Sequence, residues 1–113
     1  MEDSIKKIIQ ALRKFNDDRD WSQYHDPKNV ALAISIEASE LNEIFLWKKP
    51  SEVEIDKIKE ELADVFLYSF LMADKCGLNV EQICMDKIKR NAEKYPIAKA
   101  KGTNLKYTEF TQI

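Results

Sequence analysis

The sequence predicts an all-α protein, and three observations lead to that fold class. Glycine and proline are scarce, at two and three residues in a chain of 113, which disfavours a sheet-rich fold with many tight turns. Apolar residues near the N-terminus recur at the i, i+3, i+4, i+7 spacing of a buried helical face. Helix start and stop signals then divide the rest of the chain. We expect four helices with short connections, in a four-helix bundle-like protomer.

The first helix is expected from about Ser4 to Asp17. Its buried face would be made by Ile5, Ile8, Ile9, Leu12 and Phe15. The polar stretch from Asn16 to His25 follows it and is expected to be a loop that carries two aromatic residues.

The second helix is expected from about Pro27 to Trp47. Asp26 is a typical N-cap, Pro27 suits the first helical position, and Pro50 ends the helix.

Ser51 and Glu54 have the spacing of a capping box, so the third helix is expected to begin there and to run to about Lys75. Gly77 fits the left-handed position that follows a helix. Asn79 can cap a fourth helix, which Pro96 stops after Tyr95. Residues 97–113 show no clear period and are expected to be a loop-rich tail of a single domain that spans residues 1–113.

Composition limits the classes of function. The chain is 44% hydrophobic and 34% charged, with a net charge of −2, so no basic excess favours a nucleic acid polymer as partner. No apolar run approaches the roughly 18 residues of a membrane span. The acidic N-terminus lacks a signal sequence, and Cys76 and Cys84 lack CxxC spacing. We expect two reduced thiols and a cytoplasmic location.

Two acidic couplets interrupt otherwise apolar helical faces: Glu37-x-x-Glu40 and Glu61-x-x-Asp64. At about 100° per residue, Glu37 falls in the middle of a core stripe, and Glu40 lies at its edge. The stripe also contains Val30, Ala33, Leu41 and Ile44. Four inward carboxylates repel one another and lose hydration, so a cation is expected between them.

Oxygen-only ligands favour a hard ion, Mg²⁺ with Mn²⁺ as a possible substitute. Zinc would prefer His or Cys, and a ferritin-like di-iron site needs Glu-x-x-His couplets that are absent here. The alternative is a structural pairing of Lys57 with Glu61 at i, i+4, although one lysine cannot compensate four carboxylates.

The third helix is apolar on all sides from Leu62 to Ala73. A small protomer can hardly cover such a helix, so part of its surface is expected to meet a second copy, most simply across a two-fold axis. The alternative is a central helix wrapped within one chain.

Several residues could hold a substrate beside the metal. Lys87, Asn91 and Lys94 share one face of the fourth helix, with Tyr95 at its edge, and suit phosphate or ribose oxygens; alone, they would be a solvated face. Trp21 and Trp47 could stack on a planar base or pack at the rim of the core, and His25 could contact a base edge or cap a helix.

The spacing of the couplets resembles the ExxE…ExxD signature of MazG-type all-α nucleotide pyrophosphohydrolases. The resemblance covers about residues 15–110 and is nearest to the dCTP pyrophosphatase branch. Five further segments carry it: Arg19–Asn29 (RDWSQYHDPKN), Phe45–Lys48 (FLWK), Glu60–Val65 (EELADV), Asn91–Pro96 (NAEKYP) and Lys106–Thr108 (KYT).

This resemblance implies Mg²⁺-dependent hydrolysis of a nucleoside triphosphate, such as dCTP, to the monophosphate and pyrophosphate, for nucleotide-pool cleaning. It also implies a homodimer or a dimer of dimers. The implied metal ligands and catalytic residues are Glu37, Glu40, Glu61 and Asp64. The implied base pocket is Trp21, His25 and Trp47, and the implied sugar or phosphate contacts are Tyr68, Lys87, Asn91 and Tyr95; Lys94 would stabilise the departing pyrophosphate. Two alternatives stay open: another substrate, such as dUTP, dATP or a modified nucleotide, and a non-catalytic helical dimerisation module.

Overall fold

The computed structural model describes residues 3–112 and confirms the all-α class. Its order of elements is α1 (Ser4–Asp18), η1 (Ser22–Tyr24), α2 (Pro27–Glu43), η2 (Pro50–Glu52), α3 (Ile55–Lys75), α4 (Val80–Lys94), α5 (Ile97–Ala100) and η3 (Tyr107–Gln112). The described residues contain no strand and no helix long and apolar enough to cross a membrane. The chain divides after Leu78 into two compact units, and the expectation of a single domain stays a prediction.

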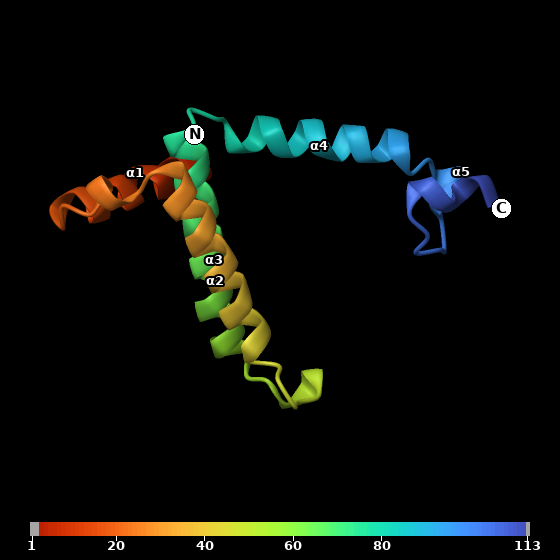
Figure 1. Ribbon diagram of the computed structural model, residues 1–113, viewed down its shortest axis with the longest axis horizontal. Helices are drawn as coiled ribbons and strands as arrows, with labels where there is room; N and C mark the ends of the chain where they lie inside the picture. The colour runs from red at the N-terminus through yellow and green to blue at the C-terminus, as the bar shows by residue number, and fades with distance from the viewer. Residues whose placement is uncertain (1–2, 113) are drawn as a thin grey trace. The chain divides into compact units, whose positions relative to one another are not determined.

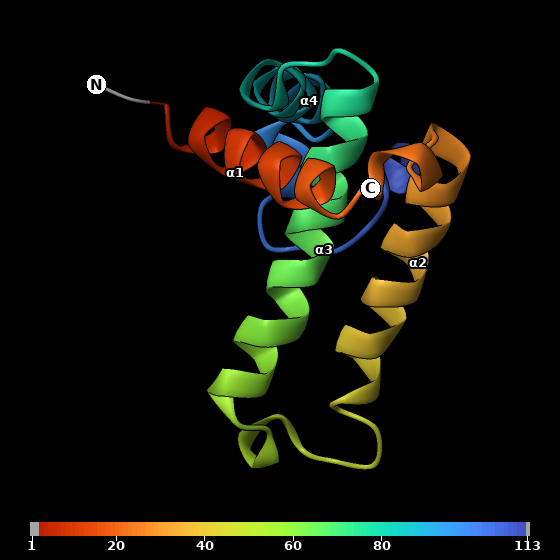
Figure 2. The same cartoon turned by 90° about the vertical axis from the view of Figure 1, so that its left-hand side faces the viewer.

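The N-terminal unit is built around the pair α2 and α3, which run side by side (Figures 1 and 2). Helix α1 packs against the C-terminal half of α3. Val30 is only 1% exposed, and Leu71 and Ala73 on α3 are also buried. The core of this unit is therefore a small cluster at the end of α3 where α1 packs.

A bidentate ion pair joins α1 to α3. Arg13 Nε donates to Asp74 Oδ2 at 2.8 Å, and Arg13 Nη2 donates to Asp74 Oδ1. The guanidinium hydrogen bond holds the pKa of Asp74 below its usual value. This fork of two charge-assisted bonds fixes how α1 lies against α3.

Most expected helix boundaries are confirmed. The Asp26 side chain caps α2 by accepting the amide of Asn29 at 2.8 Å, and the Asn79 side chain caps α4 by accepting the amide of Gln82 at 2.9 Å. Gly77 has φ +66 in a Schellman motif, in which the amide of Leu78 donates to the carbonyl of Ala73 at 2.8 Å.

Two boundaries differ from the prediction. Helix α2 ends at Glu43 rather than at Trp47, because tight turns follow it: the amide of Phe45 donates to Asn42 and that of Leu46 to Glu43. The predicted capping box at Ser51 is wrong. Ser51 lies in the short 3₁₀ turn that Pro50 begins, and α3 starts at Ile55 after Glu54, whose side chain makes no cap bond.

The C-terminal unit has its own aromatic cluster. Tyr95, at the end of α4, packs edge-on against Tyr107 and against the buried Phe110, with ring centroids 5.9 and 5.6 Å apart. Lys94 Nζ lies 5.0 Å from the centre of the Tyr107 ring. The tail that was expected to be loop-rich therefore contains α5 and η3, and η3 packs on the end of α4.

We predict that Arg13→Met lowers the melting temperature by roughly several degrees, because it leaves the half-buried Asp74 carboxylate unpaired. The matched control is Lys14→Met, which breaks only the exposed i, i+4 pair with Asp18 and should cost about one degree or less. The lowered pKa of Asp74 means that the pair stabilises above about pH 3.8 and that this contribution is lost as the pH falls. Equal melting temperatures for Arg13→Met and Lys14→Met at pH 7 would contradict the stabilising role assigned to the Arg13–Asp74 pair.

Candidate functional site

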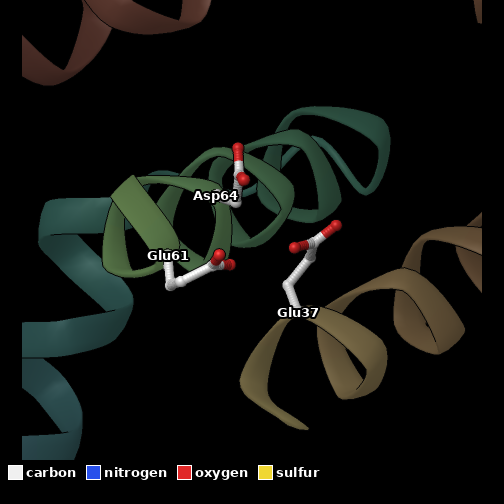
Figure 3. A group of neighbouring side chains, drawn as sticks. All are labelled: Glu37, Glu61 and Asp64. Carbon is white, nitrogen blue, oxygen red and sulfur yellow. The ribbon is translucent and has the colours of Figure 1, made fainter. Parts of the chain in front are cut away.

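Three carboxylates from two helices meet on the α2–α3 seam. Glu37 of α2 points toward Glu61 and Asp64 of α3 (Figure 3). One carboxylate oxygen from each residue lies within 4.8 Å of the others, and all three side chains are half-buried. The couplets predicted to face inward therefore do meet, because i, i+3 spacing places Glu61 and Asp64 on the same face of α3.

Two oxygens of this cluster are buried without a hydrogen-bond partner among the described residues, Glu37 Oε2 and Glu61 Oε2. No ion pair between described residues involves Lys57 or Glu61, so the structural pairing considered for that lysine does not form. Buried, unpaired carboxylate oxygens are costly, and a bound cation would satisfy them.

The electrostatic cost appears in the pKa values. Burial, followed by the adjacent Glu40 carboxyl and the charges of Asp64 and Glu61, raises the pKa of Glu37 from 4.5 to about 7. Burial and the charges of Glu40 and Asp64 also raise the pKa of Glu61. Glu40 itself is exposed, as expected for a residue at the edge of the stripe. Close acidic groups of this kind bind either protons or a metal.

A cavity of about 480 Å³ adjoins the cluster within the N-terminal unit, and Asp64 belongs to both. Its wall comes from α1, from the loop that follows α1, and from α3. The lining residues are Ile8, Ala11, Leu12, Phe15, Asn16, Trp21, His25, Asp64, Leu67, Tyr68 and Leu71. A mostly apolar cavity of this size with a few polar groups is typical of a small-molecule site.

Three residues predicted to contact substrate line this cavity: Trp21, His25 and Tyr68. Burial and the charges of Glu37, Asp64 and Glu40 raise the pKa of Tyr68, so its phenol stays protonated and can donate a hydrogen bond. His25 Nδ1 is buried without a partner, and burial and Lys75 lower the pKa of the ring, which keeps it neutral at pH 7.

Trp47 is placed differently from the other predicted base contacts. It is 94% exposed, has φ +63, and does not line the cavity. The left-handed backbone follows the end of α2 and turns the side chain out to solvent, so its predicted stacking role stays a prediction.

The predicted phosphate contacts of α4 lie in the C-terminal unit. Lys87 and Asn91 are exposed, while Lys94 and Tyr95 pack on the aromatic cluster of that unit. Their predicted roles toward substrate stay predictions.

The sequence reasoning did not identify Asn16 as a site residue, and placed it where the expected first helix and the polar loop overlap. The structure places Asn16 in the last turns of α1, buried, in the cavity wall. The signal was present, because Asn16 continues the apolar stripe of Ile9 and Leu12 at i+7 and i+4. This is the same criterion that identified Glu37.

Three comparisons with known proteins find similar chains. The model of the MazG-like family matches residues 32–110. The chain is 33% identical to dCTP pyrophosphatase 1 of Mus musculus and of Homo sapiens, over 96% of this chain and 68% of each of those proteins. The crystal structure of a pyrophosphatase from Archaeoglobus fulgidus superposes with a TM-score of 0.76 at 36% identity, covering 85% of this chain and 95% of that one.

We predict that the metal-free protein loses stability relative to its Glu37→Gln variant as the pH rises. The folded protein holds the Glu37 proton more tightly than the unfolded chain does, so its contribution is fully present below pH 4.5 and is lost as the pH passes 7. After allowance for solvent screening, the relative loss is on the order of 1 kcal/mol. Urea denaturation with a chelator at pH 5 and pH 8 measures this loss. If the difference in unfolding free energy between the protein and Glu37→Gln does not change with pH, the close approach of the carboxylates is contradicted.

Proposed function

Because the chain belongs to the MazG-like family, we propose that it hydrolyses a deoxynucleoside triphosphate to the monophosphate and pyrophosphate, with Mg²⁺ as the metal and dCTP or a related nucleotide as substrate. The general activity, that of a nucleoside triphosphate pyrophosphohydrolase, agrees with the dCTP pyrophosphatases and with the archaeal pyrophosphatase to which the chain is similar. We also propose a cytoplasmic location, since both cysteines are free.

One observation carries the proposal. Carboxylate oxygens of Glu37, Glu61 and Asp64 converge within 4.8 Å, two buried oxygens of the cluster lack a partner, and the cluster borders a largely apolar cavity. A triphosphate needs a cationic clamp, and a nucleobase needs an apolar slot beside it. In the N-terminal unit, a carboxylate cluster that could hold such a cation lies next to an apolar cavity.

The donor set fits a hard cation. All three convergent ligand atoms are carboxylate oxygens, which suit Mg²⁺ and Mn²⁺. When bound, such an ion neutralises phosphate charge and activates water for attack on phosphorus. We propose that Glu40, exposed beside the cluster, completes the set and that one of these carboxylates accepts the proton of the attacking water.

Other residues would bind and orient the nucleotide. Tyr68 is protonated beside the carboxylates and can donate to a phosphate or sugar oxygen. Trp21 and His25 line the cavity, where a planar base can pack on the indole. The cations of α4, Lys87 and Lys94, are proposed to neutralise the departing pyrophosphate.

We further propose that the protein is a homodimer or a dimer of dimers. Few large side chains of the described residues are buried, whereas several large apolar side chains of the α2–α3 pair are exposed: Leu32, Ile36, Leu62 and Phe66. Phe66 is 51% exposed and stacks on Phe70 at 5.9 Å. A second copy that covers this face would bury the surface that one protomer leaves open.

We predict that Glu61→Gln lowers kcat by roughly two or more orders of magnitude, because the cation loses a ligand. The matched control is Glu54→Gln, an exposed residue at the start of the same helix, which should stay within about threefold of the original rate. Mg²⁺ should raise the melting temperature of the unsubstituted protein and of the control but not of Glu61→Gln.

Pyrophosphate release from a panel of deoxynucleotides tests the same proposal. Release from dUTP, dATP or a modified nucleotide, but not from dCTP, would correct the substrate. Release from none of them, together with no Mg²⁺-dependent rise in melting temperature, would instead favour a non-catalytic dimerisation module.

We predict that Phe66→Glu shifts the protein toward monomer, since a carboxylate in an apolar interface loses hydration without a partner. Sedimentation velocity measures the shift. Tyr24→Glu, which changes a somewhat more exposed aromatic outside the α2–α3 face, should leave the assembly unchanged. A monomer before any substitution would contradict the proposed interface.

A further inference from the structure

Asn16 is the one buried polar residue among residues 3–110, and its side-chain amide makes none of the hydrogen bonds that form the local turn. It is 5% exposed, and no hydrogen bond joins its side-chain amide to another described residue. Its backbone carbonyl accepts the amides of Arg19 at 3.2 Å and Trp21 at 2.9 Å, so the backbone alone accounts for the local turn. A buried polar residue costs more desolvation free energy at this position than an apolar residue of similar shape would.

The amide lines the cavity that we assign to the nucleobase. Five residues of α1, including Asn16, face α3 across this cavity (Figure 2 shows α1 beside α3). Of the polar side chains in the wall, Asp64 and Tyr68 belong to the carboxylate-bearing helix. The remaining two, Asn16 and His25, come from α1 and the loop after it, and His25 Nδ1 is buried with no hydrogen-bond partner among the described residues.

We infer that the side-chain amide of Asn16 pairs with the hydrogen-bonding edge of the substrate's base and is a specificity-determining residue of this enzyme. An amide presents an acceptor oxygen and a donor NH₂ side by side. That arrangement matches a base whose edge carries a donor next to an acceptor, as the amino group and N3 of cytosine do. The inference rests on the proposed function, since it places the base of that nucleotide in this cavity.

The neutral ring of His25 supports the same orientation of the base. A neutral imidazole has one donor and one acceptor nitrogen, and Nδ1 is the buried, unpaired one. The Asn16 amide and the His25 ring lie in the wall with the apolar side chains of α1 and would give the base a fixed set of partners. The Trp21 ring, whose centroid lies 5.6 Å from that of the Phe15 ring, borders the same space.

The test compares natural deoxynucleotides with a triphosphate whose base is difluorotoluene, a ring of pyrimidine shape without strong hydrogen-bonding groups. Asn16→Leu keeps the branched shape of the side chain, adds some volume, and removes the amide. We expect kcat/KM for the preferred natural nucleotide to fall about 10- to 100-fold, with kcat/KM for the difluorotoluene nucleotide within about threefold of its original value. The melting temperature should stay equal or rise, because a buried polar group is removed.

Leu12→Met is the matched control in the same wall. It changes the shape of the cavity without changing its hydrogen bonding, so it should affect the natural and the difluorotoluene nucleotides alike. If Asn16→Leu also lowers both equally, or lowers the melting temperature by several degrees, Asn16 is a structural residue and the inference is wrong. An unchanged ratio between the two nucleotides overturns it as well.

The failure of the proposed function can be told apart from the failure of this inference. If the unsubstituted protein hydrolyses no triphosphate, the proposed function fails, and the same panel is then measured by the shift in melting temperature on binding. If the nucleotides rank by base in the size of this shift, and Asn16→Leu abolishes the ranking, the role of Asn16 is supported even though no nucleotide is hydrolysed. A ranking that persists in Asn16→Leu, or no shift with any nucleotide, overturns it.

Discussion

Repulsion among carboxylates on the α2–α3 seam is the constraint on which the rest of the structure depends. Glu37 cannot face Glu61 and Asp64 without losing hydration, and the pKa of Glu37 rises to about 7 as a result. A helix pair chosen only for stability would carry leucine at these positions. The sequence retains charge there, so the packing of α2 on α3 places a candidate cation site at the contact of the two helices.

The cavity depends on a different contact. Helix α1 supplies one wall and α3 the other, and the Arg13–Asp74 fork joins them at the end away from the carboxylates. The charged seam between α2 and α3 and the apolar space between α1 and α3 therefore share a single helix. Asp64 and Tyr68, one turn apart on α3, belong to both environments, which places the carboxylate cluster directly beside the apolar cavity.

Local signals in the sequence predicted the helices well, and the wheel predicted that Glu37 lies inside and Glu40 at the edge. Errors arose where several physical rules compete. Ile44 to Trp47 is an apolar run that looks helical, but a series of tight turns ends α2 before it. Ser51 fits a capping box, but Pro50 begins a 3₁₀ turn instead. Asn16 was grouped with the polar stretch that follows the first helix, although its position continues the stripe of Leu12. No local pattern could show that α1 and α3 enclose a cavity, since that depends on contacts between distant segments.

The placement of Glu37 on one helix and Glu61 on the next has a topological consequence. A cation held by both would act as a cross-link that closes the chain between residues 37 and 61, much as a disulfide does. Ligand oxygens on α2 and α3 coincide only in one register, because sliding either helix by a single turn moves its carboxylate by about 5.4 Å. Ion binding would then favour the correctly paired helices over slipped alternatives, so that one set of ligands would both hold the ion and fix the register of the two helices.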